Sequence, residues 1–462
     1  MKKYDSKNIL IIGAARQGLA ASRYLDKHGA RVTLTDARPE AELTDAKQSL
    51  ADTQVKTHFG AHPLELLDGV DLVCVSGGVP LDIPIIREAR KRRIKLSNDS
   101  QIFLENCPCT VIGITGSAGK TTTTTLLGKM AEQFFAMKTH KNRAWTGGNI
   151  GYPLINNVDE MHEDDLAIME LSSFQLELMT RSPHVAAVLN ITPNHLDRHG
   201  TLGAYTAAKA RILKFQKQAD LAILNRDDKG SWDLRDELHG DLISFGYKQP
   251  GRNEHGTYVE NGNIMLQIAR ERMKMLPIEW IPLRGEHNLQ NVLAACAIAA
   301  GATIALPAIQ TAIEEFEGVS HRLQLVATRN DVKWYDDSIA TTPERSLAAL
   351  KSFDEPIILL LGGRDKNLPW EDLLAFASQR AKHIILFGEA SPMIAEILGR
   401  GKKPASYLSL SQAGTLQNAV KIAAEKAEAG DIVLLSPGGT SYDAFIDFEE
   451  RGNCYAKWIS EL

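Results

Sequence analysis

The sequence predicts an α/β protein made of three domains, each with a mostly parallel sheet. Short apolar runs alternate with helical stretches along the chain, which is the pattern of parallel strands joined by crossover helices. Two of these runs end in glycine-rich turns that open a helix. A chain of 462 residues also exceeds what one hydrophobic core usually supports.

The predicted strands fall into three blocks, 1–106, 107–318 and 319–462. Cys107-Pro108 is a plausible first joint because proline interrupts strand pairing. The strands expected in the first block are 8–12, 31–35 and 71–75. Those expected in the middle block are 110–114, 166–169, 185–189 and 221–224, followed by an antiparallel insertion at 240–282 and a helix at 288–300. Those expected in the last block are 333–335, 357–361, 383–387 and 432–435.

Composition narrows the class of protein. The formal charge of −5, from 52 basic and 57 acidic residues, argues against nucleic-acid binding by bulk electrostatics, although a local cluster can still hold an anionic substrate. No apolar run reaches the length of a membrane span, and the first apolar run lacks the features of a signal peptide.

The five cysteines are scattered along the sequence. Cys107-Pro108-Cys109 could suggest a metal site, but no second pair accompanies it, so we expect reduced, structural thiols in a cytoplasmic protein.

The strongest local signal is Thr110–Thr122, where a buried strand ends in a glycine-rich turn and a Lys-Thr pair opens a helix. Such a turn lets backbone N–H groups approach phosphate oxygens, and the helix N-terminus adds partial positive charge. We expect Lys120 to contact the outer phosphates and the Thr121 hydroxyl to bind Mg²⁺. The spacing departs from the general P-loop, because Ile114 stands where a glycine is usual. The sequence thus predicts a central P-loop ATPase domain.

A weaker glycine-rich turn, Gly13–Gly18, follows the first strand, and Asp36 ends the next strand as a ribose-binding acid would. Ala15 replaces the glycine that normally lets the backbone meet a dinucleotide, so a uridine-nucleotide site fits better than a nicotinamide site; a purely structural turn is the alternative. Ser76–Pro80 follows the third strand and should lie beside this turn, because such loops converge at the carboxyl edge of a parallel sheet.

Three polar side chains in the middle block are further candidates. Glu170 directly follows strand 166–169, where a carboxylate beside a P-loop can hold Mg²⁺. His195 lies in a loop dense in Asn, Asp and Arg, a costly composition without partners, although a lone histidine is more often structural. By composition alone, Lys209 reads as an ordinary helical lysine.

In their joint order these motifs resemble the Mur ligase family, and its glutamate-adding members in particular, over almost the whole chain. The motifs that carry the resemblance are Thr115–Thr121, Gly147–Gly151, Glu170–Glu177, Asn194–Asp197, Gly285–Asn291, His321-Arg322, Asp336–Thr341, Leu434–Phe445 and Phe448–Gly452. The resemblance implies a Rossmann-like N-terminal domain for a uridine nucleotide, the central ATPase domain, and a Rossmann-like C-terminal domain for an amino acid. It implies a monomer that uses ATP and two Mg²⁺ ions to join D-glutamate to UDP-N-acetylmuramoyl-L-alanine through an acyl phosphate, in peptidoglycan precursor synthesis.

The resemblance also assigns residues. The implied catalytic residues are Lys120, Glu170, His195 and Lys209. The implied metal ligands are Thr121, Glu170, His195 and Lys209, the lysine as a carbamate. The implied ATP-binding residues are Gly116, Ser117, Ala118, Gly119, Lys120, Thr121, Thr122, Asn288, Asn291, Arg322 and Asp337. The implied substrate contacts are Arg16, Gln17, Asp36, Arg38, Ser76 and Gly78 for the uridine nucleotide, Asn149 for the muramoyl part, and Thr341, Lys366, Ser441 and Phe448 for glutamate.

One departure concerns the amino-acid pocket. The usual Asp-Ser-Lys-Ala-Thr of the family is Asp337–Thr341 here, with Ile339 in place of the lysine, so a cation is missing. Lys366 survives as an anchor for a carboxylate. L-glutamate therefore stays open as an alternative acceptor. A folylpolyglutamate-synthase-like ligase is a second alternative, although that class normally lacks the uridine-type first domain. Three domains around one reaction also imply an open-to-closed movement of residues 319–462.

Overall fold

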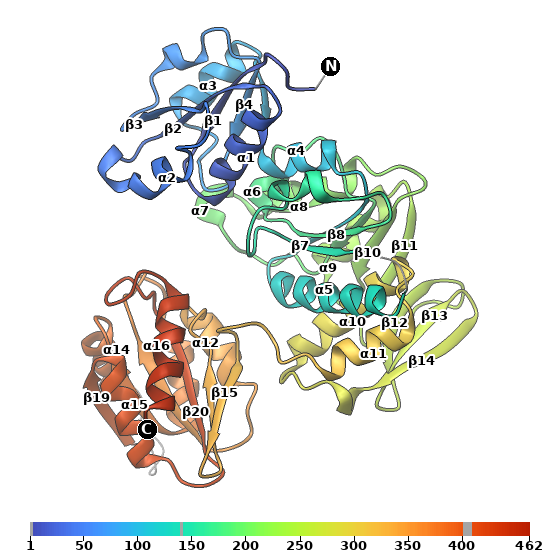
Figure 1. Ribbon diagram of the computed structural model, residues 1–462. Helices are drawn as coiled ribbons and strands as arrows, with labels where there is room; N and C mark the ends of the chain where they lie inside the picture. Colours follow the sequence, from blue (N-terminus) through green and yellow to red (C-terminus); the bar gives the residue numbers. More distant parts are fainter. Residues whose placement is uncertain (1–2, 139–141, 401–408) are drawn as a thin grey trace. The chain divides into compact units, whose positions relative to one another are not determined.

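The computed structural model describes residues 3–138, 142–400 and 409–462, and these stretches form three sheets (Figure 1). The chain divides into two compact units, Met1–Ile281 with Gln290–Glu315, and Pro282–Leu289 with Phe316–Leu462. The predicted α/β class is confirmed, with one sheet in each of the three predicted blocks. The boundaries near residues 106 and 318 stay predictions.

The first sheet is parallel throughout, in the order β3-β2-β1-β4-β5. Its strands are β1 (Asn8–Ile12), β2 (Arg31–Asp36), β3 (Lys56–Phe59), β4 (Leu72–Val75) and β5 (Lys95–Ser97). Its helices are α1 (Arg16–Lys27), α2 (Thr44–Ser49), α3 (Pro84–Lys91) and α4 (Asp99–Asn106). Ile9 and Ile11 belong to the apolar cluster that includes α1, whereas Leu10 and Ile12 belong to that of α3, because successive strand residues face opposite sides of a sheet. Helices therefore cover both faces.

The middle sheet has the order β14-β13-β12-β11-β10-β9-β6-β8-β7. Its strands are β6 (Thr110–Thr115), β7 (Ala144–Gly148), β8 (Leu166–Glu170), β9 (Val185–Val188), β10 (Leu221–Asn225), β11 (Asp241–Phe245), β12 (His255–Glu260), β13 (Asn263–Ile268) and β14 (Glu271–Pro277). Its helices are α5 (Lys120–Ala136), α6 (Ser173–Leu176), α7 (Leu196–His199), α8 (Leu202–Lys214), α9 (Lys229–Trp232), α10 (Glu286–Gly301) and α11 (Leu306–Glu314). Figure 1 shows α5, α10 and α11 on one side of this sheet and α6 and α8 on the other.

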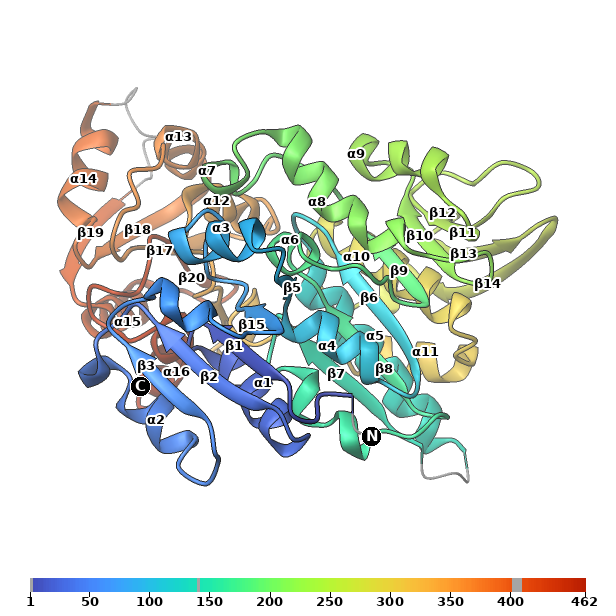
Figure 2. The ribbon, with the colours of Figure 1, turned by 90° about the horizontal axis from the view of Figure 1, so that it is seen from above.

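The insertion predicted at 240–282 is only partly antiparallel. Strand β11 pairs parallel with β10, and β12 pairs parallel with β11, so the antiparallel part begins at β12 and continues through β13 and β14 (Figure 2). Asn261 and Gly262 both adopt positive φ between β12 and β13, as a tight hairpin turn requires. The turn residues that suggested an antiparallel segment thus belong to this hairpin, whereas β11 extends the parallel sheet.

The last sheet has the order β15-β16-β20-β17-β18-β19 and is parallel except for the β15–β16 pair. Its strands are β15 (Gln324–Arg329), β16 (Val332–Asp336), β17 (Ile357–Gly362), β18 (Ala381–Phe387), β19 (Ser409–Gly414) and β20 (Ile432–Gly438). Its helices are α12 (Pro343–Leu350), α13 (Glu371–Arg380), α14 (Ser391–Arg400), α15 (Leu416–Lys426) and α16 (Phe448–Ser460). Leu359 and Leu361 pack in the cluster with α12–α14, and Ile358 and Leu360 pack in the cluster with α15 and α16.

Across the described stretches, no helix combines the length and the apolar character needed to cross a membrane. All five cysteines lie in these stretches, and each is a free thiol.

Candidate active site

The glycine-rich turn between β6 and α5 is tightly packed. Gly119 has φ +81°, and a Cβ atom added there would stand 2.2 Å from Oδ1 of Asn291. Only glycine satisfies both the left-handed backbone and this close approach. Asn291, on α10, therefore lies directly against the turn. Its role in nucleotide binding stays a prediction.

The loop after β9 holds the same turn from the other side. The N–H of Ser117 donates to the carbonyl of Asn190 (3.0 Å), and the N–H of Ala118 donates to Asn190 Oδ1 (2.8 Å). Ser117 Oγ donates to the carbonyl of Thr192 (2.9 Å) and lies 3.0 Å from the hydroxyl of Tyr205. Sequence reasoning gave Asn190, Thr192 and Tyr205 no role of their own. The density of polar residues in this loop was the available signal.

Two lysine side chains converge on one carbonyl of the turn. Lys120 Nζ donates to the Gly116 oxygen (2.9 Å), and Lys209 Nζ donates to the same oxygen (2.8 Å) and lies 3.4 Å from Thr115 Oγ1. Lys209 is only 1% exposed, so reading it as an ordinary helical lysine is wrong: α8 turns this residue toward the phosphate loop. Burial, and then the charge of Lys120, lower the pKa of Lys209 to about 6, against the opposing effect of Glu170. The amine is therefore largely neutral at pH 7.

Glu170 ends β8 and is 1% exposed. Its two carboxylate oxygens accept hydrogen bonds from Thr121 Oγ1 and from Asn149 Nδ2, both at 2.9 Å. Parallel pairing of β6 with β8 brings the ends of both strands to one edge of the sheet, which explains why Glu170 meets the first turn of α5. Three predicted site residues are thus joined.

The donor set around Glu170 fits a magnesium ion shared with phosphates. Mg²⁺ prefers oxygen ligands and is commonly held by one or two carboxylates together with substrate phosphates. Thr121 and Glu170 provide such oxygens side by side. The buried hydroxyl of Thr122 has no hydrogen-bond partner among the described residues. Within the same residues, no cluster of three or more His, Cys, Asp and Glu side chains forms a metal site built from protein alone.

His195 has φ +53° and packs edge to face against the aromatic ring of Phe174, with ring centroids 5.2 Å apart. Phe174 also stacks on His199, with ring centroids 5.1 Å apart, and the His199 ring lies 5.3 Å from that of Tyr205. The Nζ atom of Lys209 lies 4.7 Å from the centre of the Tyr205 ring. The structure therefore places His195 and Lys209 at two ends of one aromatic group. Their use as ligands of one metal ion stays a prediction.

The two turns of the first domain lie side by side, as predicted. Ser76 Oγ donates to the carbonyl of Gly13 (2.9 Å), and a Cβ at Gly18 would stand 1.9 Å from that oxygen. Arg16 Nη1 donates to the carbonyl of Gly151 (2.8 Å), and Gly78 accepts from Arg198 Nη1 (3.3 Å). The predicted uridine-nucleotide loops thus contact the middle block within one compact unit.

Asp36 already has partners in the protein. Its Oδ2 accepts from the N–H of Ala14 (2.7 Å) and from Arg38 Nη2 (2.9 Å). Burial alone would raise the pKa of Asp36, but the hydrogen bonds from Arg38 and Ala14 outweigh it and lower the pKa to about 2. This ionised carboxylate orients Arg38, a cation suited to a phosphate.

In the second compact unit, Lys366 Nζ lies 3.5 Å from Thr341 Oγ1, which brings two predicted glutamate contacts together. Arg345 Nη1 donates to the carbonyl of Ile339 (3.4 Å). Desolvation, and then the charge of Arg345, lower the pKa of Lys366. Arg345 thus places a cation beside the position where the family lysine is missing, and sequence reasoning did not identify it.

The remaining predicted residues of this unit lie around the end of β16. Asp337 accepts from Ser436 Oγ (2.7 Å), and burial raises its pKa to about 7. The carbonyl of Phe448 accepts from Ser338 Oγ (2.8 Å), and the Phe448 ring faces His321 at 6.3 Å. The other predicted residues here are placed as follows: Asn288 donates to the carbonyl of Arg284 (2.7 Å), Arg322 lies near enough to Asp337 to lower its pKa, and Ser441 is buried.

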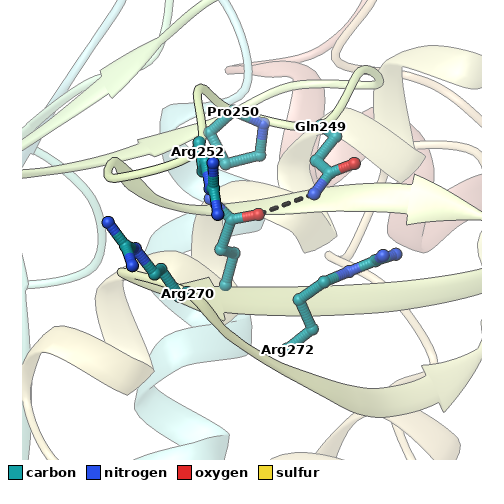
Figure 3. Close-up of a pocket in the computed structure, with 6 residues that line it drawn as sticks. Gln249, Pro250, Arg252, Arg270 and Arg272 are labelled. Carbon is teal, nitrogen blue, oxygen red and sulfur yellow. Dashed lines mark hydrogen bonds between the residues drawn. The ribbon is translucent and has the colours of Figure 1, made fainter.

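A separate cavity of about 410 Å³ lies on the extension formed by β12–β14 (Figure 3). Its lining residues are Gln249, Pro250, Arg252, Gln267, Arg270 and Arg272. Arg272 is already paired with Glu260 and Tyr258. None of the predicted site residues lines this cavity, so it is distinct from the phosphate loop.

Comparisons with known proteins identify the family of the chain. Three family models match: the Mur ligase MurD-like N-terminal domain at residues 7–98, the Mur ligase middle domain at 114–299, and the Mur ligase glutamate ligase domain at 321–439. A UDP-N-acetylmuramoylalanine–D-glutamate ligase of Koribacter versatilis is 36% identical, over 99% of this chain and 98% of that protein. A ligase of the same name from Pelotomaculum thermopropionicum is 37% identical, over 100% and 99%.

Solved structures share the fold. UDP-N-acetylmuramate–alanine ligase of Thermotoga maritima matches with a TM-score of 0.59 at 19% identity, over 98% of this chain and 99% of that one. MurF ligase of the same organism, solved in complex with ADP, matches with a TM-score of 0.58 at 15% identity, over the whole of both chains. The phosphate loop, the carboxylate at its side and the three sheets define an ATP-dependent ligase fold. The chain belongs to the Mur ligase family.

Proposed function

We propose that this chain is an ATP-dependent ligase that joins D-glutamate to UDP-N-acetylmuramoyl-L-alanine. The observation that carries the proposal is the junction of Thr121, Glu170 and Asn149 beside the phosphate loop, with the buried amine of Lys209 on the same loop. The relatives of that name, similar over their full length, support the same assignment.

The chemistry follows from the weakness of a carboxylate as an electrophile. The alanyl carboxylate attacks the γ-phosphorus of ATP, ADP leaves, and an acyl phosphate forms. The amine of glutamate then attacks the acyl carbon, loses a proton, and phosphate leaves. The protein contributes position and charge rather than a covalent intermediate. Magnesium, when bound, would offset charge on the phosphates.

Each site residue has a role in this scheme. Lys120 and the N-terminus of α5 would hold the phosphates, Thr121 and Glu170 would hold the first magnesium ion, and Asn149 would contact the muramoyl part. His195 is the candidate base for the amine proton. Lys209, largely neutral at pH 7, can react with CO₂ as a free amine and become an anionic carbamate, which would turn it into an oxygen ligand for a second ion.

The glutamate pocket is proposed around Thr341 and Lys366, with Arg345 as a second cation. A guanidinium is well suited to a carboxylate because it can donate two parallel hydrogen bonds. One observation favours L-glutamate as an alternative acceptor: Ile339 stands at the position where the usual family pattern Asp-Ser-Lys-Ala-Thr has a lysine, so that cation is missing.

Phosphate release tests the proposal. Purified protein with ATP, Mg²⁺ and UDP-N-acetylmuramoyl-L-alanine should release phosphate with D-glutamate, and mass spectrometry should show the dipeptide product. Higher activity with L-glutamate would select the alternative acceptor. Activity with a folate and glutamate instead, or with neither acceptor, would overturn the proposal.

The Lys120→Ala variant serves as the loss-of-function comparison. Loss of a positive contact to the transferred phosphoryl group should lower kcat about 100- to 1,000-fold. A matched variant, Lys129→Ala, removes a lysine on the same helix that has no proposed role, and its kcat should match that of the unmodified protein. Equal kcat for Lys120→Ala and the unmodified protein would contradict the role of the loop.

A further inference from the structure

The segment Cys107-Pro108-Cys109 joins the end of α4 to the start of β6 and has no part in the proposed ligation. The two Sγ atoms lie 3.4 Å apart, and the Sγ of Cys107 lies 3.8 Å from the thioether sulfur of Met161. Cys107 is half-buried, so a small reagent can reach it, whereas Cys109 is 2% exposed and belongs to the apolar cluster beneath. The chain therefore holds two thiols in contact, one at the surface and one behind it.

We propose that Cys107 and Cys109 are a redox-active dithiol that closes to an intramolecular disulfide by exchange with a low-molecular-weight disulfide. A disulfide requires a sulfur–sulfur distance of about 2.05 Å, so closure shortens the present separation by about 1.4 Å, a change that side-chain rotation can contribute to. No other cysteine is in contact with either thiol among the hydrogen-bonded pairs of the described residues. Cys74 and Cys296 are 1% and 0% exposed and are closed to a reagent. Cys454 is half-buried like Cys107, but no second thiol is in contact with it among the hydrogen-bonded pairs of the described residues, so it can form only an adduct.

The backbone holds the pair in place. The N–H of Cys107 donates to the carbonyl of Phe103 (2.8 Å), which caps α4, and Cys109 precedes the first residue of β6. Pro108 fixes its own φ between them. Because both ends and the middle of the segment are constrained, the two thiols do not have to be brought together by a loop closure.

The two thiols differ in acidity in a way that orders the reaction. The two sulfur atoms share a hydrogen bond in which either can be the donor. With the thiol of Cys109 as the donor, this hydrogen bond lowers the pKa of Cys107, although burial opposes the shift. The same hydrogen bond, followed by burial, raises the pKa of Cys109. Cys107, the less buried of the two, is therefore the attacking thiol, and Cys109, which is 2% exposed, is the resolving thiol.

The exchange balances without a metal or a further oxidant. The Cys107 thiolate attacks one sulfur of the small disulfide, which expels one small thiolate and leaves a mixed disulfide. Cys109 then loses its proton to solvent and attacks the Cys107 sulfur, which expels the second small thiolate. The protein loses two electrons and two protons, and the small disulfide is reduced to two thiols. Closure across a single intervening residue strains the bond, and strained disulfides are easily reduced again, so the step is reversible.

Intact-protein and peptide mass spectrometry test the proposal. Folded, full-length protein is incubated with oxidised glutathione, alkylated in denaturant and digested with trypsin. The peptide 96–120, which contains no other cysteine, should lose two hydrogens and escape alkylation, and dithiothreitol should restore both thiols. The Cys107→Ser and Cys109→Ser variants should lose this species completely, and Cys109→Ser should stop at a glutathione adduct on Cys107. The Cys454→Ser variant, which lacks an unrelated half-buried thiol, should behave as the unmodified protein.

A second measurement does not depend on oxidation. Phenylarsine oxide bridges two thiols in contact, so the reduced protein should bind one equivalent in the native state, and either single variant should bind none tightly. Thermal melting of each variant checks that it is folded. A folded protein that forms only glutathione adducts, or that binds no arsenical, overturns the proposal. Because neither readout involves nucleotide or glutamate, its failure leaves the proposed ligase activity unaffected.

Discussion

A single buried amine, that of Lys209, gives the sharpest expectation at the residue scale. Its lowered pKa, about 6, means that it is neutral and nucleophilic toward CO₂ at pH 7.5 and protonated at pH 5. With ¹³C-bicarbonate, NMR should therefore show one carbamate signal at pH 7.5 that disappears as the pH falls through about 6. The Lys209→Arg variant should lack the signal and lose roughly 100-fold or more in kcat if the carbamate holds a metal ion.

Control variants test whether the carbamate signal comes from Lys209 and not from another lysine. Lys214→Arg, at the end of the same helix, should keep both the signal and the activity. A carbamate signal that survives in Lys209→Arg would contradict the assignment.

The lowered pKa of Lys209 also affects stability. Between about pH 6 and pH 10.5 the unfolded chain binds more protons at this lysine than the folded chain does, so the contribution of Lys209 to the free energy of unfolding rises with pH over that window.

Arg345 carries a second expectation at this scale, which rests on the proposed function. If it stands in for the cation missing at Ile339, Arg345→Ala should raise KM for glutamate about tenfold and leave KM for ATP unchanged, since one charge-assisted hydrogen bond contributes about 1.5 kcal/mol or more. Initial rates at varied glutamate measure the effect. Lys351→Ala, which removes another cation near the end of α12, should leave both constants unchanged. Equal sensitivity of the two variants would argue against a specific role for Arg345.

At the residue scale, the sequence allows a contact between two site residues to be expected where chemistry and position coincide. Glu170 and Thr121 each stand at the end of a strand or the start of a helix, and the structure joins them. Lys209 could not be recognised from its own helix, because its burial depends on the packing of α8 against the phosphate loop. Arg345 was missed for a related reason: its proximity to Ile339 is a product of the tertiary fold.

At the scale of elements, buried strands were predictable and edge strands were not. Strands β1, β6 and β17 are buried along most of their length, and their apolar runs mark them within a residue or so. Every residue of strands β3 and β19 is exposed or half-buried, and no apolar run marks either strand in the sequence. What makes them strands is an available sheet edge, which belongs to the fold rather than to the local sequence.

The packing of α1 onto its strand gives the expectation for an element. A Cβ at Gly18 would lie 1.9 Å from the Gly13 carbonyl and 2.8 Å from Ser76 Oγ, so Gly18→Ala must push α1 away from the turn. We expect a loss of about 1–3 kcal/mol in the free energy of unfolding and weaker binding of a uridine nucleotide. Urea unfolding and calorimetric titration measure the two effects. Gly203→Ala, where the added Cβ would meet only one atom at 3.9 Å, should cause neither. Unchanged stability in Gly18→Ala would show that the turn adapts freely.

For the whole molecule, the important fact is that the assigned nucleotide-binding residues are divided between two compact units. Lys120, Thr121 and Asn291 belong to one unit, and Arg322 and Asp337 to the other. If both sets hold one ATP molecule, its binding must restrict the units to a common arrangement, and the favourable interactions of both sets with the nucleotide must supply the free energy of that restriction. The sequence predicted the three sheets from local alternation, but the division into two units depends on apolar packing between blocks, such as Ile155 in the same cluster as Leu25.

Small-angle X-ray scattering tests this restriction. We expect the radius of gyration to fall when a non-hydrolysable ATP analogue, Mg²⁺ and UDP-N-acetylmuramoyl-L-alanine are added together, and to change less with either substrate alone. Lys120→Ala, which weakens one side of the nucleotide site, should reduce the change, whereas Lys129→Ala should not. Binding is confirmed in the same samples by calorimetry, so that a missing change cannot be ascribed to an empty site. Identical scattering profiles for bound and free protein would mean that the two units do not close on their substrates.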